Sequence, residues 1–542
     1  MTRAHRFVAS TALALLAGSA CGQTTFAVPS AQAPTLQFIL ESPASTLAQG
    51  DTIVLTEAGF YLGTFTIDTP DVTIEAAEGA DIVLDALGEG LPIGVFVGSV
   101  LTAGPNADGL TLRGLTVRGG KAPLGGGLYI SDNVDVTIED CVFETNVAGN
   151  DGGGVYAEDG TDVVIRRSTF RNNAATAESA IPSDGGGLYA REASVTIEDS
   201  TFENNTAGTD GGGTAFFTSD LQIERTLFVR NAAGADGGAV WAFAGSDGQI
   251  VDVEFIYNTA GNDGGASRFE SSGVETIRSR FHANVAERFG GAISARGEIA
   301  GGDNENDVFD SIFVGNRGVN GAVFIAETGP DPLVLNCTVV DNICTGAAEA
   351  GAFVNTGGAA GIAIRNSIMR GNVPRAHDTN PVASTAFQYC NLQEPDASVF
   401  NSAGNANIDA DPMFIAAPSD GGDGWGDNPA TIDIDESLND DFGDLRLVRD
   451  SPSIDAGDAN LIAISANPVD IAGLARVIGI DGFDPDVDPG EGVFGQVPDH
   501  GAHEVQATST QGALVDVNGD GFIDFFDVVA WLGLFDAAFN GG

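Results

Sequence analysis

The most constraining feature of this sequence is a motif, F-x-x-N, that returns at a nearly fixed interval. Successive motif asparagines lie 26 to 32 residues apart, and short β-branched runs and Gly-Gly turns fill the intervals. Such a period, without a helical pattern, predicts a solenoid in which every coil covers the core of its neighbour. The motif occupies Phe143/Asn146, Phe170/Asn173, Phe202/Asn205, Phe228/Asn231, Phe255/Asn258, Phe281/Asn284 and Phe313/Asn316, with looser copies at Val339/Asn342 and Met369/Asn372.

Two columns of this motif carry the expected architecture. Stacked coils bring equivalent residues to about 4.8 Å, so each motif position becomes a ladder along a rod. We expect the motif asparagines to occupy a tight turn at positive φ, with side-chain amides bonded to the coils above and below. We expect the motif phenylalanines to stack inside the core. Both columns predict shape and say little about chemistry.

A third column alternates in charge. In register, each inner member would have an opposite charge on both sides, and each pair would contribute roughly 0.2 to 1 kcal/mol. Because a slip by one coil would bring like charges together, we interpret the column as a device that sets the register. Its members are Asp140, Arg167, Asp199, Arg225, Asp252, Arg278 and Asp310.

A fourth column carries one sign of charge only. Each member precedes a Gly-Gly pair, where an aspartate ordinarily accepts hydrogen bonds from the following turn amides. The alternative is a row of bound Ca²⁺, which takes carboxylate oxygens from flexible loops. The column consists of Asp151, Asp184, Asp210, Asp236 and Asp263.

The excess of acidic over basic residues restricts the classes of molecule that the protein can bind. The chain has 23 Lys and Arg against 76 Asp and Glu, a formal net charge of -53. Nucleic acid is excluded as a partner, because its binders need basic side chains to displace phosphate counterions. An acidic surface favours solubility and attracts divalent cations.

The N-terminus has the pattern of an export signal. Arg3 and Arg6 precede an apolar run from Phe7 to Ala17, and small residues follow it. Residues 1–22 are therefore predicted to be a signal peptide, and the mature chain to be secreted to the extracellular space or cell surface. Lipidation at Cys21 stays open. No other stretch approaches the roughly 20 apolar residues that cross a bilayer.

The other cysteines do not form a disulfide framework. Cys141, Cys337, Cys344 and Cys390 are too few for a chain of 542 residues. A bridge between Cys337 and Cys344 stays open.

The first coils and the repeats resemble a known family. The runs Gly50 to Leu55, Gly59 to Tyr61 and Val72 to Glu75 resemble the entry of the pectin-lyase-like right-handed parallel β-helices, and the motif coils resemble polymorphic outer-membrane-protein repeats. The resemblance implies an all-β right-handed parallel β-helix over residues 34–505, after a linker at 23–33. A terminal cap is expected from about residue 373, where the period loosens, and we interpret His500 and His503 as part of this cap.

The C-terminus carries the most specific motif in the chain. After a polar linker at 506–512, the pattern D-x-N-x-D-G matches a calcium loop, with side-chain oxygens, one carbonyl and a glycine that permits the sharp turn. The predicted ligands are Asp516, Asn518, Asp520, Phe522, Asp524 and Asp527. With an apolar segment after the loop and no helix clearly before it, residues 513–542 resemble a single dockerin repeat. This resemblance implies Ca²⁺ as cofactor and a cohesin-like or cell-surface scaffold protein as partner.

Two functions from different classes follow. The first is a secreted, non-catalytic surface or adhesion rod that is attached through its calcium module. The alternative is an extracellular polysaccharide lyase or glycoside hydrolase that the same module recruits to a scaffold. An enzyme needs a strand face that departs from the repeat. The insertion Asp303 to Asp307 is the clearest outlier, and we interpret it as a solvated loop. No catalytic residue is predicted.

Overall fold

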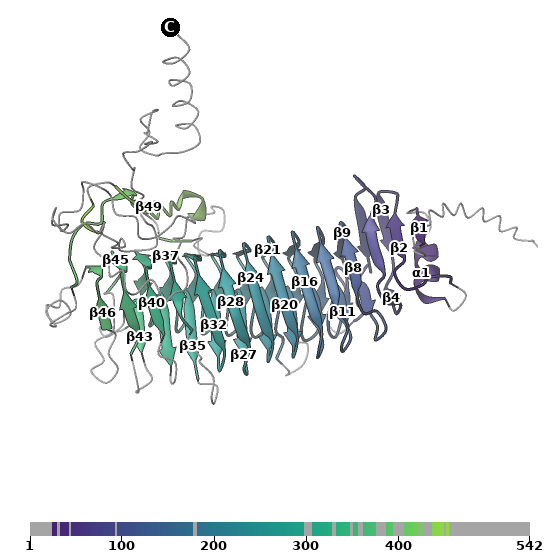
Figure 1. Ribbon diagram of the computed structural model, residues 1–542, viewed down its shortest axis with the longest axis horizontal. Helices are drawn as coiled ribbons and strands as arrows, with labels where there is room; N and C mark the ends of the chain where they lie inside the picture. The colour runs from purple at the N-terminus through teal and green to yellow at the C-terminus, as the bar shows by residue number, and fades with distance from the viewer. Residues whose placement is uncertain are drawn as a thin grey trace, which may run out of the picture.

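A computed structural model describes residues 24–454, except 30–32, 43–44, 93–94, 177–181, 298–305, 328–331, 347–350, 356–360, 375–385, 394–405, 423, 427–435 and 449–450. Its strands form a long rod with four parallel sheets wound around one core (Figure 1). A complete coil contributes one strand to each sheet, in the order I, II, III and IV, before the chain returns to sheet I one step along. The predicted parallel β-helix is thereby confirmed.

Sheets I and II are the longest and carry most of the pairing between coils. Sheet I contains β1 (Thr25–Val28), β2 (Thr52–Leu55), β5 (Thr73–Ala76), β8 (Leu110–Arg113), β12 (Val136–Glu139), β16 (Asp162–Arg166), β20 (Ser194–Glu198), β24 (Asp220–Glu224), β28 (Asp247–Val251), β32 (Gly273–Ile277), β36 (Val308–Phe309), β40 (Leu333–Leu335), β44 (Ala363–Arg365) and β46 (Ala386–Gln388). Sheet II contains β3 (Gly59–Leu62), β6 (Ile82–Asp85), β9 (Leu115–Arg118), β13 (Val142–Glu144), β17 (Thr169–Arg171), β21 (Thr201–Glu203), β25 (Leu227–Val229), β29 (Glu254–Ile256), β33 (Arg280–His282), β37 (Ile312–Val314), β41 (Thr338–Val340), β45 (Ile368–Arg370) and β47 (Asn391–Leu392).

Sheets III and IV complete each coil. Sheet III contains β10 (Lys121–Ala122), β14 (Val147–Ala148), β18 (Ala174–Ala175), β22 (Thr206–Ala207), β26 (Ala232–Ala233), β30 (Thr259–Ala260), β34 (Val285–Ala286), β38 (Arg317–Gly318) and β42 (Ile343–Cys344). Sheet IV contains β4 (Phe65–Ile67), β7 (Leu101–Ala103), β11 (Leu128–Ile130), β15 (Val155–Ala157), β19 (Leu188–Arg191), β23 (Thr214–Phe217), β27 (Val240–Phe243), β31 (Ser267–Glu270), β35 (Ile293–Arg296), β39 (Phe324–Glu327) and β43 (Phe353–Asn355).

A short helix covers the first coil. Helix α1 (Ala33–Glu41) buries Leu36, Ile39 and Leu40, whose spacing places them on one face. Strand β1 lies within the stretch 23–33 that the sequence analysis treats as a linker, yet it pairs with β2 over its full length. Together β1 and α1 cover the open end of the solenoid, which would otherwise expose strand edges. No helix in the described part of the chain has the length and apolar character to cross a membrane.

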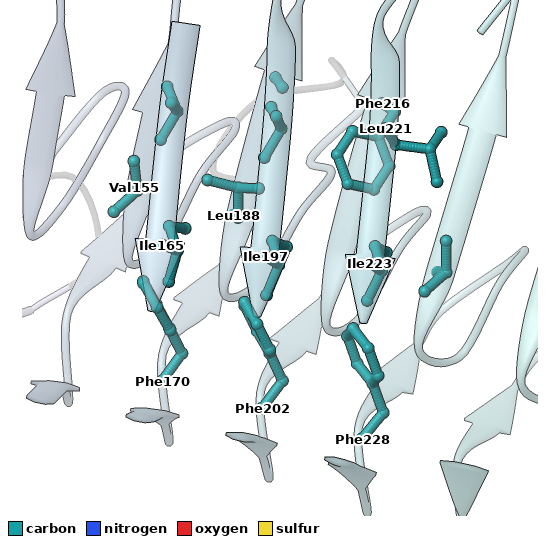
Figure 2. Packing of buried hydrophobic residues seen from close by; sticks show 14 of the residues in the cluster. Val155, Ile165, Phe170, Leu188, Ile197, Phe202, Phe216, Leu221, Ile223 and Phe228 are labelled. Atoms are coloured by element: carbon teal, nitrogen blue, oxygen red, sulfur yellow. The ribbon is translucent and has the colours of Figure 1, made fainter. Parts of the chain in front are cut away.

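The motif phenylalanines form a continuous stack in the core. Their ring centroids lie 4.7 to 5.2 Å apart from coil to coil, with interplanar angles of 13° or less. Figure 2 shows Phe170, Phe202 and Phe228 in successive coils, below Ile165, Ile197 and Ile223. The prediction of a structural Phe column is confirmed.

The motif asparagines also form a buried ladder, although one detail was predicted wrongly. Asn173 Oδ1 accepts hydrogen bonds from the backbone N–H (3.1 Å) and Nδ2 (3.0 Å) of Asn146, while Asn173 Nδ2 donates to Phe143 O at 2.9 Å. The positive φ falls on the residue before each asparagine, for example 55° at Asn172 and 56° at Tyr257. The asparagine side chain therefore forms hydrogen bonds with backbone groups at the turn between sheets II and III, and the residue before it adopts the left-handed conformation of that turn.

The alternating column pairs its charges two by two. Arg167 contacts Asp140 at 2.9 Å, and the same contact from an arginine to the preceding coil recurs between Arg225 and Asp199 at 2.8 Å. The prediction of an opposite charge on both sides of an inner member is confirmed, because Asp140 and Asp199 both raise the pKa of Arg167. The close contact of each guanidinium is with the aspartate of the preceding coil. Two further alternating columns flank this one, starting with Glu75, Arg113 and Glu139 on sheet I and with Asp85, Arg118 and Glu144 on sheet II.

Candidate functional site

The outer face of sheet II changes character along the rod. Residues on either side of each motif phenylalanine point away from the core, because side chains alternate along a strand. In the middle coils one of these outward columns carries Glu144, Arg171 and Glu203. Toward the C-terminal end the same column becomes largely apolar, with Val229, Ile256, Val314 and Val340 and with His282 between Ile256 and Val314. An apolar outer face of this kind needs a cover.

The chain itself provides that cover. After the last coils it returns over sheet II through β48 (Phe414–Ala416), the 3₁₀ helix η2 (Glu436–Asn439) and β49 (Asp444–Leu447). Ile312, Val314 and Val340 pack there with Leu445 and with part-buried aromatic residues of the returning segment. Figure 1 shows β49 above the end of the rod that contains β37 and β45. We call the described residues between 413 and 448 the returning segment.

Aromatic rings form the junction between rod and returning segment. Phe442 stacks on His282, with ring centroids 4.2 Å apart, and on Trp425 at 5.5 Å. Burial lowers the pKa of His282 to about 3, so its imidazole is neutral at ordinary pH. The junction is therefore an apolar contact rather than an ionic one.

Polar contacts hold the same junction at Tyr257. The Tyr257 hydroxyl donates to Asp440 Oδ2 at 2.9 Å and to the Ser437 carbonyl at 3.2 Å. Arg230 lies over the Tyr257 ring, 5.2 Å from its centroid, and its Nη2 donates to Ser437 Oγ at 2.9 Å. Burial and the bond to Asp440 raise the pKa of Tyr257, so the phenol keeps its proton. These residues fix one wall of a hollow between rod and segment.

The hollow is a cavity with a volume of about 600 Å³. Its rod side comes from sheet III and from the turns beside it, including those that follow sheet II, and its other side comes from the returning segment. The chemically notable residues that line it are Arg230, Tyr257, Glu287, Arg317 and Trp425. Sequence reasoning missed this site, because no local pattern predicts that the returning segment folds over these coils.

Arg317 is the residue of this cavity with the clearest capacity for a ligand. Its side chain is exposed, and it forms no ion pair with any described residue. Most described arginines of this acidic chain contact a carboxylate of a neighbouring coil, as Arg171 contacts Glu144 at 2.6 Å. A guanidinium that is left without a carboxylate offers its planar donor fork to an anionic group.

The Asp column lies at the turn between sheets III and IV. Each carboxylate accepts the backbone N–H of the next Asp, as in Asp210 N–H to Asp184 Oδ1 at 3.0 Å and Asp236 N–H to Asp210 Oδ1 at 2.8 Å. The predicted donor, an amide of the same turn, is wrong, because the donor belongs to the next coil. Burial raises the pKa of Asp151 to about 6, of Asp184 to about 8 and of Asp210 to about 7.

Arg268 marks a departure from the repeat beside this column. The outward position of sheet IV carries Tyr129, Tyr156 and Tyr189, then Ala215 and Trp241, before Arg268 replaces the aromatic residue. The Arg268 side chain is 1% exposed. Its guanidinium lies 2.9 Å from Glu327, 3.6 Å from Asp263 and 3.9 Å from Asp236. Aligning the residues after each Gly-Gly pair would have revealed this change.

The remaining predicted residues divide into two groups. Cys141, Cys337, Cys344 and Cys390 are buried free thiols, so Cys337 and Cys344 are not bridged. Asn306 and Asp307, predicted to lie in a solvated loop, are instead buried, and their side chains accept the N–H of Val274 and Leu333.

The other group lies outside the described residues: Cys21, His500, His503 and the calcium loop Asp516, Asn518, Asp520, Phe522, Asp524 and Asp527. Within the described part, no group of three or more His, Cys, Asp or Glu has the arrangement of a metal site.

Comparison with known proteins identifies the fold. Residues 100–267 match a family described as the right handed beta helix region. No curated protein matches the chain.

Similar solved structures include an alginate lyase from Paenibacillus sp. str. FPU-7, 14% identical, covering 67% of this chain and 99% of that one, with a TM-score of 0.31. The pectate lyase Pel9A is 15% identical, covers 85% of this chain and 89% of its own, and has a TM-score of 0.33. Similarity at this level concerns the fold and does not identify a reaction. None of these comparisons supports a non-catalytic adhesion role.

Proposed function

We propose that this protein binds an acidic polysaccharide in the cavity between the rod and the returning segment. The observation that carries the proposal is that Arg317, which has no ion pair with any described residue, lies with Tyr257 and Trp425 in one hollow of a chain with net charge -53. A ligand that tolerates such an acidic surface must gain specific contacts, and a guanidinium beside aromatic walls supplies them.

The chemistry of the cavity suits a charged sugar. A volume of about 600 Å³ lies in the range of small-ligand sites, roughly 300 to 1,000 Å³. Arg317 can form a two-pronged contact with a carboxylate or sulfate. The exposed Glu287 can accept sugar hydroxyl groups, and the rings of Tyr257 and Trp425 offer amphipathic surface. Arg230 is already engaged with Ser437 and therefore shapes the wall rather than the anion contact.

Calorimetric titration of the full chain with oligosaccharides of alginate and pectate, and with a neutral glucan, tests this function. We expect binding of an acidic sugar only, and a loss of at least about tenfold in affinity, or about 1.4 kcal/mol, in Arg317→Glu. Arg296→Glu, an equal change of charge at an exposed residue of sheet IV, should keep the affinity. Equal affinities of the two variants, or equal binding of the neutral glucan, would refute the proposal.

A polysaccharide lyase or glycoside hydrolase is the second candidate. The specific observation in its favour is the pair Asp184 and Asp210, whose carboxyls have a pKa of about 8 and about 7, near the range that proton transfer needs. The charge of Arg268 acts on Asp210, and Arg268 contacts Asp236 and Asp263 farther along the same column. Incubation with alginate and pectate, followed by ultraviolet detection of unsaturated products and by reducing-end assay, separates lyase, hydrolase and binding protein. Activity that survives in Asp210→Asn would remove this candidate.

Secretion and calcium binding complete the proposal. Residues 1–22 would direct export, and the loop with Asp516, Asn518, Asp520, Phe522, Asp524 and Asp527 would hold Ca²⁺ through oxygen donors. The support is the fit of loop spacing and donor types to this ion. The loop would attach the rod to a cohesin-like or cell-surface scaffold protein. Calcium titration of the full chain should give a binding isotherm that Asp520→Ala abolishes, and an unchanged isotherm would contradict this assignment.

A further inference from the structure

Gly315 occupies a distinctive place in the column of left-handed turn residues that precede the motif asparagines. In the preceding coils this column carries Arg230, Tyr257 and Ala283. All of these have positive φ, 54°, 56° and 52°, so the conformation itself does not require glycine. Ala283, one coil earlier, shows that an alanine is accommodated in this turn. The glycine at 315, where φ is 69°, therefore needs another reason.

The reason is the Trp425 indole. A Cβ added to Gly315 would lie 2.5 Å from Trp425 Cδ2, 2.6 Å from Cγ and 2.9 Å from Cδ1. Real Cβ contacts are longer than this, and the three distances are similar because the ring lies over the glycine backbone. The indole is thus seated on the rod at the one coil whose turn residue lacks a side chain at the cavity. We call this contact the tryptophan seat.

The returning segment positions the indole from its other side. Gly426 N–H donates to Asp440 Oδ2 at 2.8 Å, and the same oxygen accepts the Tyr257 hydroxyl at 2.9 Å. Gly424 and Gly426, with φ of 106° and 83°, adopt conformations that favour glycine. The indole lines the cavity.

We propose that Gly315 is a positioning residue that sets the width of the cavity by seating Trp425 on the rod backbone. A side chain at 315 pushes the indole outward, separates it from Arg317 across the hollow, and removes one wall of the site. The effect of the tryptophan seat on ligand binding rests on the proposed polysaccharide function, whereas the contact between Gly315 and Trp425 does not.

Two substitutions of the full chain separate seating from backbone strain. Gly315→Ala places a methyl group under the indole. Gly371→Ala is the matched control, because Gly371 lies in the same column with φ of 67°, and its new methyl would meet the movable Asp341 carboxylate. Trp425→Phe identifies the contribution of Trp425 among the three tryptophans.

The readouts are acrylamide quenching of tryptophan fluorescence without ligand, thermal unfolding, and titration with the acidic oligosaccharide. We expect Gly315→Ala to make the Trp425 emission more accessible to quencher and to weaken binding about tenfold, while its melting temperature matches that of Gly371→Ala. Unchanged quenching in Gly315→Ala would overturn the seat. Changed quenching with unchanged affinity would overturn its role in the site. If the wild-type chain binds no sugar, the proposed function fails and the quenching result alone decides the seat.

Discussion

The middle coils and the coils under the returning segment share one repeat but use its outward residues differently. In the middle, outward charges are paired with the adjacent coil, as Arg171 is with Glu144 and Arg167 with Asp140. Under the returning segment, the positions equivalent to Arg171 are apolar except for His282, and the chain folds back over them. In the middle coils, the outward charged side chains pair with one another and form no cavity with another described part of the chain. At the covered end, the outward side chains pack against the returning segment, and a cavity forms between the two. The candidate site therefore lies where the coils contact a segment outside the repeat.

Removing a ring from the Phe column should have the largest effect. Phe228 is fully buried between Phe202 and Phe255, so Phe228→Ala should lower the free energy of unfolding by about 3 to 5 kcal/mol. Urea unfolding followed by circular dichroism measures this loss. Phe217→Ala, which truncates a half-buried ring on the outer face of sheet IV, should cost clearly less. Similar losses of unfolding free energy in the two variants would show that the Phe column contributes no more to stability than an outer ring does.

Ionisation of the Asp column should lower the free energy of unfolding of the rod as the pH rises. Burial, with repulsion from Asp210 and Asp151, raises the pKa of Asp184 to about 8. In the unfolded chain this carboxyl ionises near its ordinary pKa, about 3.9. Its contribution to folding is therefore fully present at lower pH and is lost as the pH rises from about 4 to about 8.

Asp184→Asn keeps the acceptor oxygen and removes the titration. The variant should melt at a higher temperature than wild type at alkaline pH and at a similar temperature in acid. Asp199→Asn is the control with the opposite sign, because the hydrogen bond from Arg225 lowers the pKa of Asp199. That variant should lose stability at neutral pH, and the loss should fade as the pH falls. Parallel pH profiles for Asp184→Asn and wild type would show that the column is ionised throughout.

Loosening the returning segment should leave the rod folded. Phe442 joins His282 and Trp425 in one stack, and Phe442→Ala should release the segment locally. Limited proteolysis should then cleave near residues 413–448 faster, while the main thermal transition shifts little, because the motif columns do not involve this residue. A large shift of the main transition would mean that the cover is part of the rod's core.

Reversing one charge in the alternating column should have the smallest effect. Arg225 is about half exposed and contacts Asp199 and Glu224, so Arg225→Asp should cost roughly 0.2 to 1 kcal/mol for each lost or reversed pair. Thermal unfolding at low salt should show a larger decrease than Arg296→Asp, and high salt should reduce the difference. Equal decreases would discard the register role.

The rod could be predicted from the repeat because its contacts join equivalent residues of neighbouring coils. Phe and Asn columns follow from equal spacing, and so do the coil-to-coil bonds of Asn146 to Asn173. An error arose where a contact has two available partners, because Asp184 accepts an amide of the next coil instead of one in its own turn. Spacing alone does not decide between such partners.

The sequence by itself determined the solenoid, the identity of its core columns and the acidic character of its surface. Each of these follows from residues that repeat at one period, so that every coil presents the same groups to the next. Only the tertiary structure decided where a ligand could bind. Arg230 and Ser437 are 207 residues apart, and their contact depends on the returning segment packing over apolar outer positions. No periodicity encodes that packing, because it joins a repeated surface to a segment that occurs once.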